Sequence, residues 1–138
     1  MRKTSKIIII AMLMLTFFAI PVSAATTNFT LTVTRNGQNQ DPISKRTEKA
    51  GGSKYEKKFY VTNETFTGIG DMRVTSINLN NSKIVSKPKT INQKTKGVHD
   101  SWGTDYKTIA PSNQYYFLKA EYASGLGNSL NATGRYTP

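Results

Sequence analysis

Tyr115-Tyr-Phe-Leu-Lys-Ala-Glu-Tyr-Ala123 is the most regular stretch of the sequence and decides its fold class. The even-numbered side chains from Tyr116 to Tyr122 are all apolar or aromatic, whereas the odd-numbered positions include a lysine and a glutamate. Strict alternation of this kind is typical of a β-strand with one buried face. Residues 130–136 alternate in the same way after a turn at 124–128, so we expect the two segments to form a C-terminal hairpin.

The same alternation recurs earlier in the chain. Residues 29–34 place Phe, Leu and Val on one face and three threonines on the other. Asn36-Gly37 then favours a tight hairpin turn. The return arm, residues 38–43, is polar and contains Pro42, so it would be an edge strand at best.

Further strands are expected in the middle of the chain. We predict strands at 55–62 and 71–79, separated by a turn at 63–70. The apolar residues of the second strand change parity between Val74 and Ile77, which predicts a bulge near Ser76. Shorter strands are expected at 83–86 and 106–110.

These segments together predict an all-β fold. No run after residue 25 has apolar residues at helical spacing. Several short strands separated by turns are typical of a small antiparallel β-sandwich, or a partly open barrel, of about 6–8 strands. A signal-peptide helix would precede it.

The first residues have the pattern of an export signal. Arg2, Lys3 and Lys6 give a positive start, residues 7–20 are almost wholly apolar, and Pro21 ends that run. This three-part arrangement is typical of a removable secretory signal peptide. An uncleaved membrane anchor is the alternative, because the apolar stretch is just long enough to span a bilayer core.

Small residues follow the proline at the predicted cleavage region. Cleavage after Ala24 places Val22 and Ala24 in the two pockets of a signal peptidase, and cleavage after Ala25 places Ser23 and Ala25 there. We therefore expect a cleavable signal peptide at 1–24 and a single β-rich domain at 25–138. The mature protein would be secreted and extracellular, or associated with the cell wall through its charge.

Charge is the strongest compositional feature of the mature chain. The full chain has a formal net charge of +11, the signal contributes three basic residues and no acid, and +11 − 3 leaves +8. A field of this sign attracts polyanions such as anionic lipid, wall polymers or nucleic acid. The alternative is that the charge serves solubility alone. Cysteine is absent, so stability must come from a packed core or from a partner, with tyrosines supplementing a sparse aliphatic core.

Two basic stretches are the candidate binding residues. Lysines alone can dock on anionic surfaces as point charges. The alternative is that they protect edge strands from aggregation. The candidate anionic-surface residues are Lys54, Lys57, Lys58, Lys83, Lys87, Lys89, Lys94 and Lys96.

The sequence offers little support for catalysis. His99-Asp100-Ser101 contains the residue types of a hydrolase triad, but triad members converge in space and rarely adjoin in the chain. One histidine and no cysteine disfavour a transition-metal site. We therefore predict no catalytic residues, no metal site and no cofactor.

The layout resembles a family of small secreted proteins of Gram-positive bacteria known only as a domain of unknown function. The similar segments are 27–33, Arg46-Thr47, 58–62, 115–122 and 134–138. The resemblance implies secretion and a β domain, and it brings no catalytic residues. A fainter likeness, of type alone, is to Sec-exported lactococcin-type bacteriocins, which are also basic and cysteine-free.

Three functions follow as hypotheses. The first is a secreted, cationic, non-enzymatic protein that associates with anionic cell-envelope polymers or with a membrane surface, without a specific nucleic-acid partner. The second is a bacteriocin-like antimicrobial protein. The third is a small extracellular hydrolase that works through His99.

Overall fold

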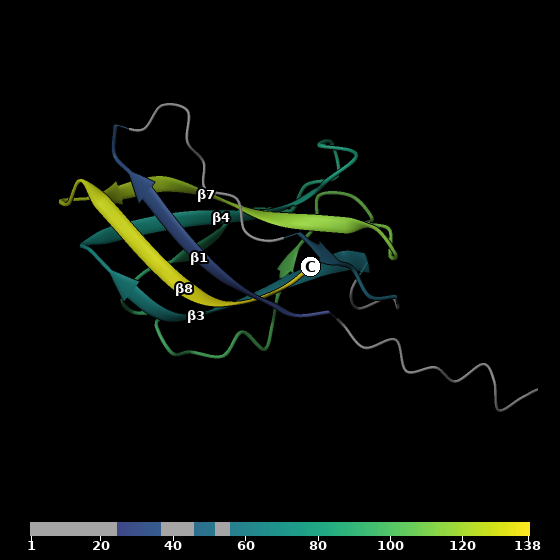
Figure 1. The fold of residues 1–138 in the computed structure, drawn as a ribbon, viewed down its shortest axis with the longest axis horizontal. Helices are drawn as coiled ribbons and strands as arrows, with labels where there is room; N and C mark the ends of the chain where they lie inside the picture. Colours follow the sequence, from purple (N-terminus) through teal and green to yellow (C-terminus); the bar gives the residue numbers. More distant parts are fainter. Residues whose placement is uncertain (1–24, 37–45, 52–55) are drawn as a thin grey trace, which may run out of the picture.

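The computed structural model describes residues 25–36, 46–51 and 56–138, and this part of the chain is all β. Its eight strands form two antiparallel sheets that pack face to face (Figure 1). The strands are β1 (Thr27–Thr34), β2 (Thr47–Glu48), β3 (Lys58–Thr67), β4 (Gly70–Asn78), β5 (Lys89–Ile91), β6 (Thr104–Asp105), β7 (Tyr115–Gly125) and β8 (Ser129–Thr137). The predicted small antiparallel sandwich is confirmed.

Several predictions fall on residues outside the described ranges. They are the signal-peptide helix with Val22 and Ala24, the return arm at 38–43, and Lys54. Among the described residues, no helix is long and apolar enough to cross a membrane.

The two sheets have four strands each. One has the order β1-β8-β3-β6, and the other has the order β2-β7-β4-β5. In Figure 1, β1, β8 and β3 cross in front of β7 and β4. The longest pairings are between long strands: β8 pairs along the whole of β1, and β7 pairs along β4.

The alternation predicted for β7 and β8 is confirmed. In β7, Tyr116, Leu118 and Ala120 are fully buried, and in β8 the even-numbered residues from Leu130 to Tyr136 are buried. These two rows meet in the core between the sheets.

The predicted C-terminal hairpin is wrong, because β7 and β8 belong to different sheets. β7 pairs with β2 and β4, whereas β8 pairs with β1 and β3. The turn between them therefore crosses from one sheet to the other, a connection that we call an arch. Alternation cannot distinguish a hairpin from an arch, since both bury one face of each strand. The connection from β3 to β4 is a second arch of the same kind.

The turn predicted at 63–70 is confirmed only at its end, because β3 continues to Thr67 and only Gly68 and Ile69 separate it from β4. Its pairing with β8 shifts register between Asn63 and Thr65. The extra residue, Glu64, moves the buried positions from the parity of Val61 to that of Phe66. Polar residues at the bulge resemble a turn in the sequence, although the strand carries on through them.

The bulge predicted near Ser76 is absent from β4. Ser76 and Asn78 point inward and are buried, while Ile77 is partly exposed and Leu79, just beyond the strand, is exposed. The register shift in β4 lies instead between Asp71 and Met72. Two polar side chains thus lie in the core of the sandwich, whereas the sequence pattern favoured burial of the apolar residues next to them, Ile77 and Leu79.

A hydrogen-bond network explains why Ser76 can be buried. Its hydroxyl lies 2.5 Å from the Tyr106 hydroxyl and 2.6 Å from the Tyr136 hydroxyl. Buried polar groups are tolerated when they find partners of this kind. The same tyrosines pack edge-on in the core, where the Tyr106 ring lies 6.0 Å from Phe59 and 5.7 Å from Tyr116. Aromatic rings therefore supplement the sparse aliphatic core.

The segment from 83 to 110 is less regular than predicted. Residues 83–86 form only isolated bridges, Ile77 with Val85 and Ser86 with Tyr106. The expected strand at 106–110 is replaced by β6, which pairs with the start of β3. This segment connects the two sheets along one edge.

Candidate functional site

The candidate lysines do not gather into one patch. Lys57 precedes β3, Lys83 lies in the turn after β4, and Lys94 and Lys96 follow β5. All four side chains are exposed, and none has an ion-pair partner within the described part of the chain. They can therefore present their ammonium groups to an external anion.

The two basic stretches meet at one carboxylate. Lys58 and Lys87 each place their Nζ 3.7 Å from a different oxygen of Asp105. All three side chains are partly exposed, so these contacts contribute little to stability. One negative charge between two positive charges leaves a net positive charge at this point.

Lys89 has an internal role. Its Nζ lies 2.6 Å from Oδ2 of Asp100, whose side chain is only 5% exposed. The same carboxylate accepts hydrogen bonds from the backbone N–H of Val61 at 2.9 Å and of Gly103 at 3.0 Å. Burial opposes ionisation, but the Lys89 and backbone contacts outweigh it and lower the pKa of Asp100. Asp100 thus ties the loop at 97–103 to β3.

Asp100→Asn should destabilise the protein by about 2–3 kcal/mol, because it leaves the buried Lys89 contact without its carboxylate. The loop carries the chain's one tryptophan, Trp102, whose side chain is 85% exposed. Urea unfolding measures the stability loss, and a lower fluorescence anisotropy of Trp102 reports the released loop. Asp105→Asn, at a half-exposed carboxylate, is the control and should change both readings little. Equal effects from both variants would contradict the anchoring role.

The triad at His99-Asp100-Ser101 does not assemble in the structure. The described contacts of the Asp100 carboxylate are with Lys89, Val61 and Gly103, and none is with His99. His99 and Ser101 are exposed beside it. No group of three or more His, Asp or Glu residues within the described ranges could hold a metal ion.

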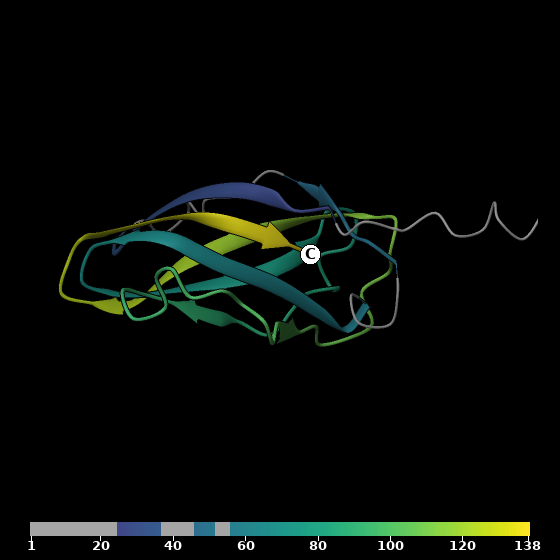
Figure 2. The ribbon, with the colours of Figure 1, turned by 90° about the horizontal axis from the view of Figure 1, so that it is seen from below.

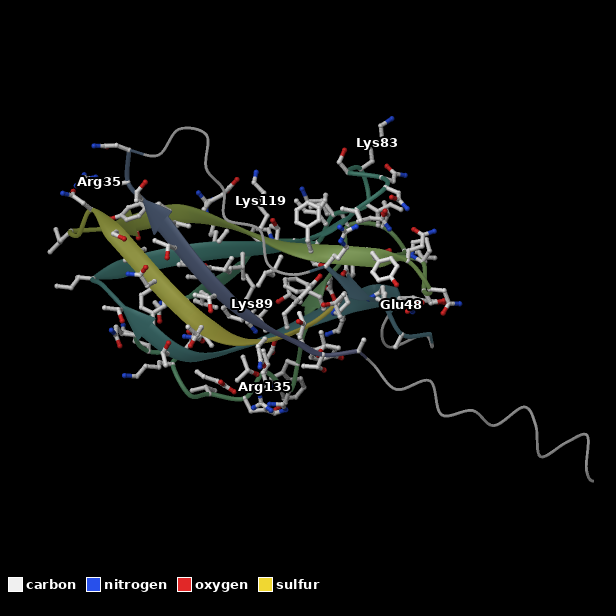
Figure 3. All side chains as sticks on the ribbon, in the orientation of Figure 1. Arg35, Glu48, Lys83, Lys89, Lys119 and Arg135 are labelled. Carbon is white, nitrogen blue, oxygen red and sulfur yellow. The ribbon has the colours of Figure 1, made fainter. Side chains whose placement is uncertain are left out.

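Exposed arginines and one further lysine widen the cationic surface. Sequence reasoning passed over Arg35, Arg46, Arg73 and Lys107 because they are single residues outside the lysine-rich stretches. All four are exposed in the structure. Figure 3 labels Arg35 and Lys83 at opposite ends of the molecule, so the positive charge extends over its full length.

Lys49 was also missed, and it is buried. Its Nζ donates a hydrogen bond to the carbonyl of Lys58 at 3.2 Å and lies 4.5 Å from the centre of the Tyr106 ring. Burial lowers the pKa of Lys49 to about 7, although the charge of Glu56 works in the opposite direction. Nothing in the charged segment around Lys49 distinguishes it from a surface lysine.

One open depression of about 430 Å³ lies beside the β3–β4 arch. It is lined by Asn92, Gln93 and Lys94 and by the arch residues 68–70. Asp71 lies at its edge, where hydrogen bonds from Asn92 at 2.8 Å and Ser124 at 2.9 Å lower its pKa. The Gln93 amide donates to the Phe66 carbonyl at 2.7 Å, so Lys94 supplies the cation of the depression, while its amides and its carboxylate are already hydrogen-bonded.

No family model, no curated protein and no solved structure matches this chain. The resemblance to a small secreted Gram-positive family therefore stays a prediction.

Proposed function

We propose that this is a secreted, non-enzymatic protein that associates with the anionic polymers and surfaces of the cell envelope through distributed positive charge. The observation that carries the proposal is an excess of exposed cations that lack carboxylate partners in the described part of the chain. These are Arg35, Arg46, Lys57, Arg73, Lys83, Lys94, Lys96 and Lys107.

The carboxylates give little compensation for this charge. Glu64 lies 2.8 Å from Nε of Arg135, Glu121 lies 3.1 Å from Nζ of Lys119, and Asp105 lies between two lysines. Asp100 is occupied by Lys89 in the interior. Each ion pair removes one cation together with one carboxylate. Among the described residues, the carboxylates without an ion pair are Glu48, Glu56 and Asp71, and the exposed unpaired cations outnumber them, so the surface field remains positive.

The arrangement supports weak, multivalent attraction. Exposed lysines are compact, hydrated point charges on flexible stems, and they contact phosphate groups without demanding one geometry. Because such contacts are solvent-exposed, salt screens them within about 8 Å at physiological ionic strength. The binding expected of this surface is broad in partner and strongly salt-dependent.

A charge-reversal experiment tests the proposal. Polyphosphate serves as the probe, and its affinity for the purified protein is measured at several salt concentrations. Lys57→Glu combined with Lys83→Glu should lower the affinity at least roughly thirtyfold at low salt, since each lysine near an anionic surface contributes about 1 kcal/mol and each glutamate adds repulsion. The matched control, Lys57→Arg with Lys83→Arg, keeps the charge and should keep the affinity. Binding by the Glu variant equal to that of the control would refute the proposal.

A further inference from the structure

The end of the sandwich where the two arches meet carries two exposed aliphatic side chains. Ile69 in the β3–β4 arch is 68% exposed and Leu126 in the β7–β8 arch is 84% exposed. Figures 1 and 2 both show these two connections side by side at the left end of the molecule. We call Ile69 and Leu126 the apolar tip.

Backbone contacts hold the apolar tip in place. The N–H groups of Leu126 and Gly127 donate to the carbonyl of Ile69, at 3.0 Å and 3.5 Å. Directly beneath, Gly70 pairs with Gly125 in the ladder between β4 and β7, with φ angles of 155° and 145° that side chains rarely adopt. These contacts join the two arches at one end of the sandwich. The joined backbone holds Ile69 and Leu126 in exposed positions.

Each of the two arches has an exposed cation nearby. Arg35 is exposed, and its backbone N–H donates to the carbonyl of Asn128 in the β7–β8 connection at 2.9 Å. Lys94 is also exposed and lines the depression beside Ile69. The nearby carboxylate, Asp71, is held by Asn92 and Ser124 and faces the charge of Lys94. Apolar side chains thus project from an end with net positive charge.

We propose that the apolar tip inserts into the interface of an anionic lipid membrane, with Arg35 and Lys94 pairing with lipid phosphates. This inference rests on the proposed function and names a membrane as one of its surfaces. Two side chains on a narrow end offer too little area for a stable protein interface, which needs about 800 Å² on each partner. A bilayer takes up a protruding aliphatic side chain without a shaped pocket, and its phosphates match the flanking cations.

Vesicle binding tests the inference. The protein, purified from the culture medium of an expressing host, is titrated with vesicles containing phosphatidylglycerol and with vesicles of phosphatidylcholine alone. Ile69→Ser combined with Leu126→Ser should lower affinity for the anionic vesicles at least roughly tenfold. The control is Val98→Ser with Ile109→Ser, at aliphatic residues that are 61% and 69% exposed elsewhere. It should bind like the unmodified protein.

A second measurement locates the insertion directly. In a Trp102→Phe background, Leu126→Trp places a single fluorophore at the apolar tip. Its emission should shift to the blue with phosphatidylglycerol vesicles and be quenched by lipids brominated near the headgroup. An unshifted emission on bound vesicles, or full binding by the double serine variant, would overturn the inference.

Polyphosphate binding separates this inference from the proposed function. The double serine variant keeps every cation, so its polyphosphate affinity should remain that of the unmodified protein. Retained polyphosphate binding with tip-independent vesicle binding would refute the inference alone. Absent polyphosphate binding with tip-dependent vesicle binding would refute the polymer part of the proposed function alone.

Discussion

Gly134→Ala is expected to abolish cooperative folding, with a loss of at least about 4 kcal/mol. Gly134 lies in β8, a central strand of its sheet, opposite Asn63 of β3. A β-carbon at this position would overlap the carbonyl oxygen of Thr62 and come within 2.9 Å of Cα of Asn63. Both obstacles are backbone atoms next to the β3 bulge, so a rotamer change cannot relieve them.

Urea unfolding followed by circular dichroism is the measurement for this variant. Asn131→Ala, at an exposed position on the same strand, is the control and should cost less than about 1 kcal/mol. A Gly134→Ala protein with a transition as steep and as late as that of the control would show that β3 and β8 are not this close.

Lys49→Met is expected to stabilise the protein at pH 7 by about 2 kcal/mol and to remove a pH dependence. Lys49 is fully buried, and within the described part of the chain its Nζ has one hydrogen bond, to the Lys58 carbonyl, besides its contacts with the Tyr106 and Tyr116 rings. Replacing a buried charged group by an apolar side chain of similar length is often neutral or stabilising, because the cost of removing the charge from water disappears.

The sign of the pH dependence follows from the lowered pKa. Lys49 has a pKa of about 7 in the folded protein against 10.5 for an unperturbed lysine, so the unfolded chain binds more protons between these limits. The free energy of unfolding should therefore rise with pH from about 7 to 10, by an amount on the order of 3 kcal/mol. Above pH 10 the raised pKa values of Tyr106 and Tyr136 act in the opposite direction, so measurements should stop at about pH 9.5.

The control for Lys49 is Lys107→Met, which removes an exposed lysine. Urea denaturation at several pH values should give the unmodified protein and this control the same upward slope, and Lys49→Met a flat profile. If Lys49→Met keeps the slope, then Lys49 is not the group that titrates.

Most of the fold could be predicted from the alternation of apolar and polar residues in the sequence. The side chains of β1, β7 and β8 follow a period of two, and in each strand the predicted buried face is the buried one. The long strands, the sandwich class and the role of tyrosines in the core could therefore be predicted from the residues alone.

Pairing partners could not be predicted in the same way. A hairpin and an arch bury the same row of side chains, so the separation of β7 from β8 is invisible in a pattern of period two. Ser76 and Asn78 could be buried because Tyr106, Tyr136 and Gln114 supply partners from distant segments. Such partners are close in space but far apart in the chain.

The sequence predicted which type of residue forms the candidate site, but it could not predict which individual lysines are exposed and which are buried or paired. Exposed lysines such as Lys83 and Lys94 lie on the surface as the sequence suggests. Lys89 is engaged by Asp100 and Lys49 is buried, and their sequence neighbours are as charged as those of the surface lysines. The apolar tip was missed because Ile69 and Leu126 are single aliphatic residues in Gly-rich turns, and only the two arches bring them together.

The distribution of the protein between cell wall and medium tests the central claim most directly. The full chain is expressed in a Gram-positive host, and the washed wall fraction is compared with the medium at low and at high salt. We expect protein lacking residues 1–24 that stays with the wall at low salt and moves to the medium as salt rises. Retention inside the cell, or a distribution unchanged by salt, would contradict the account.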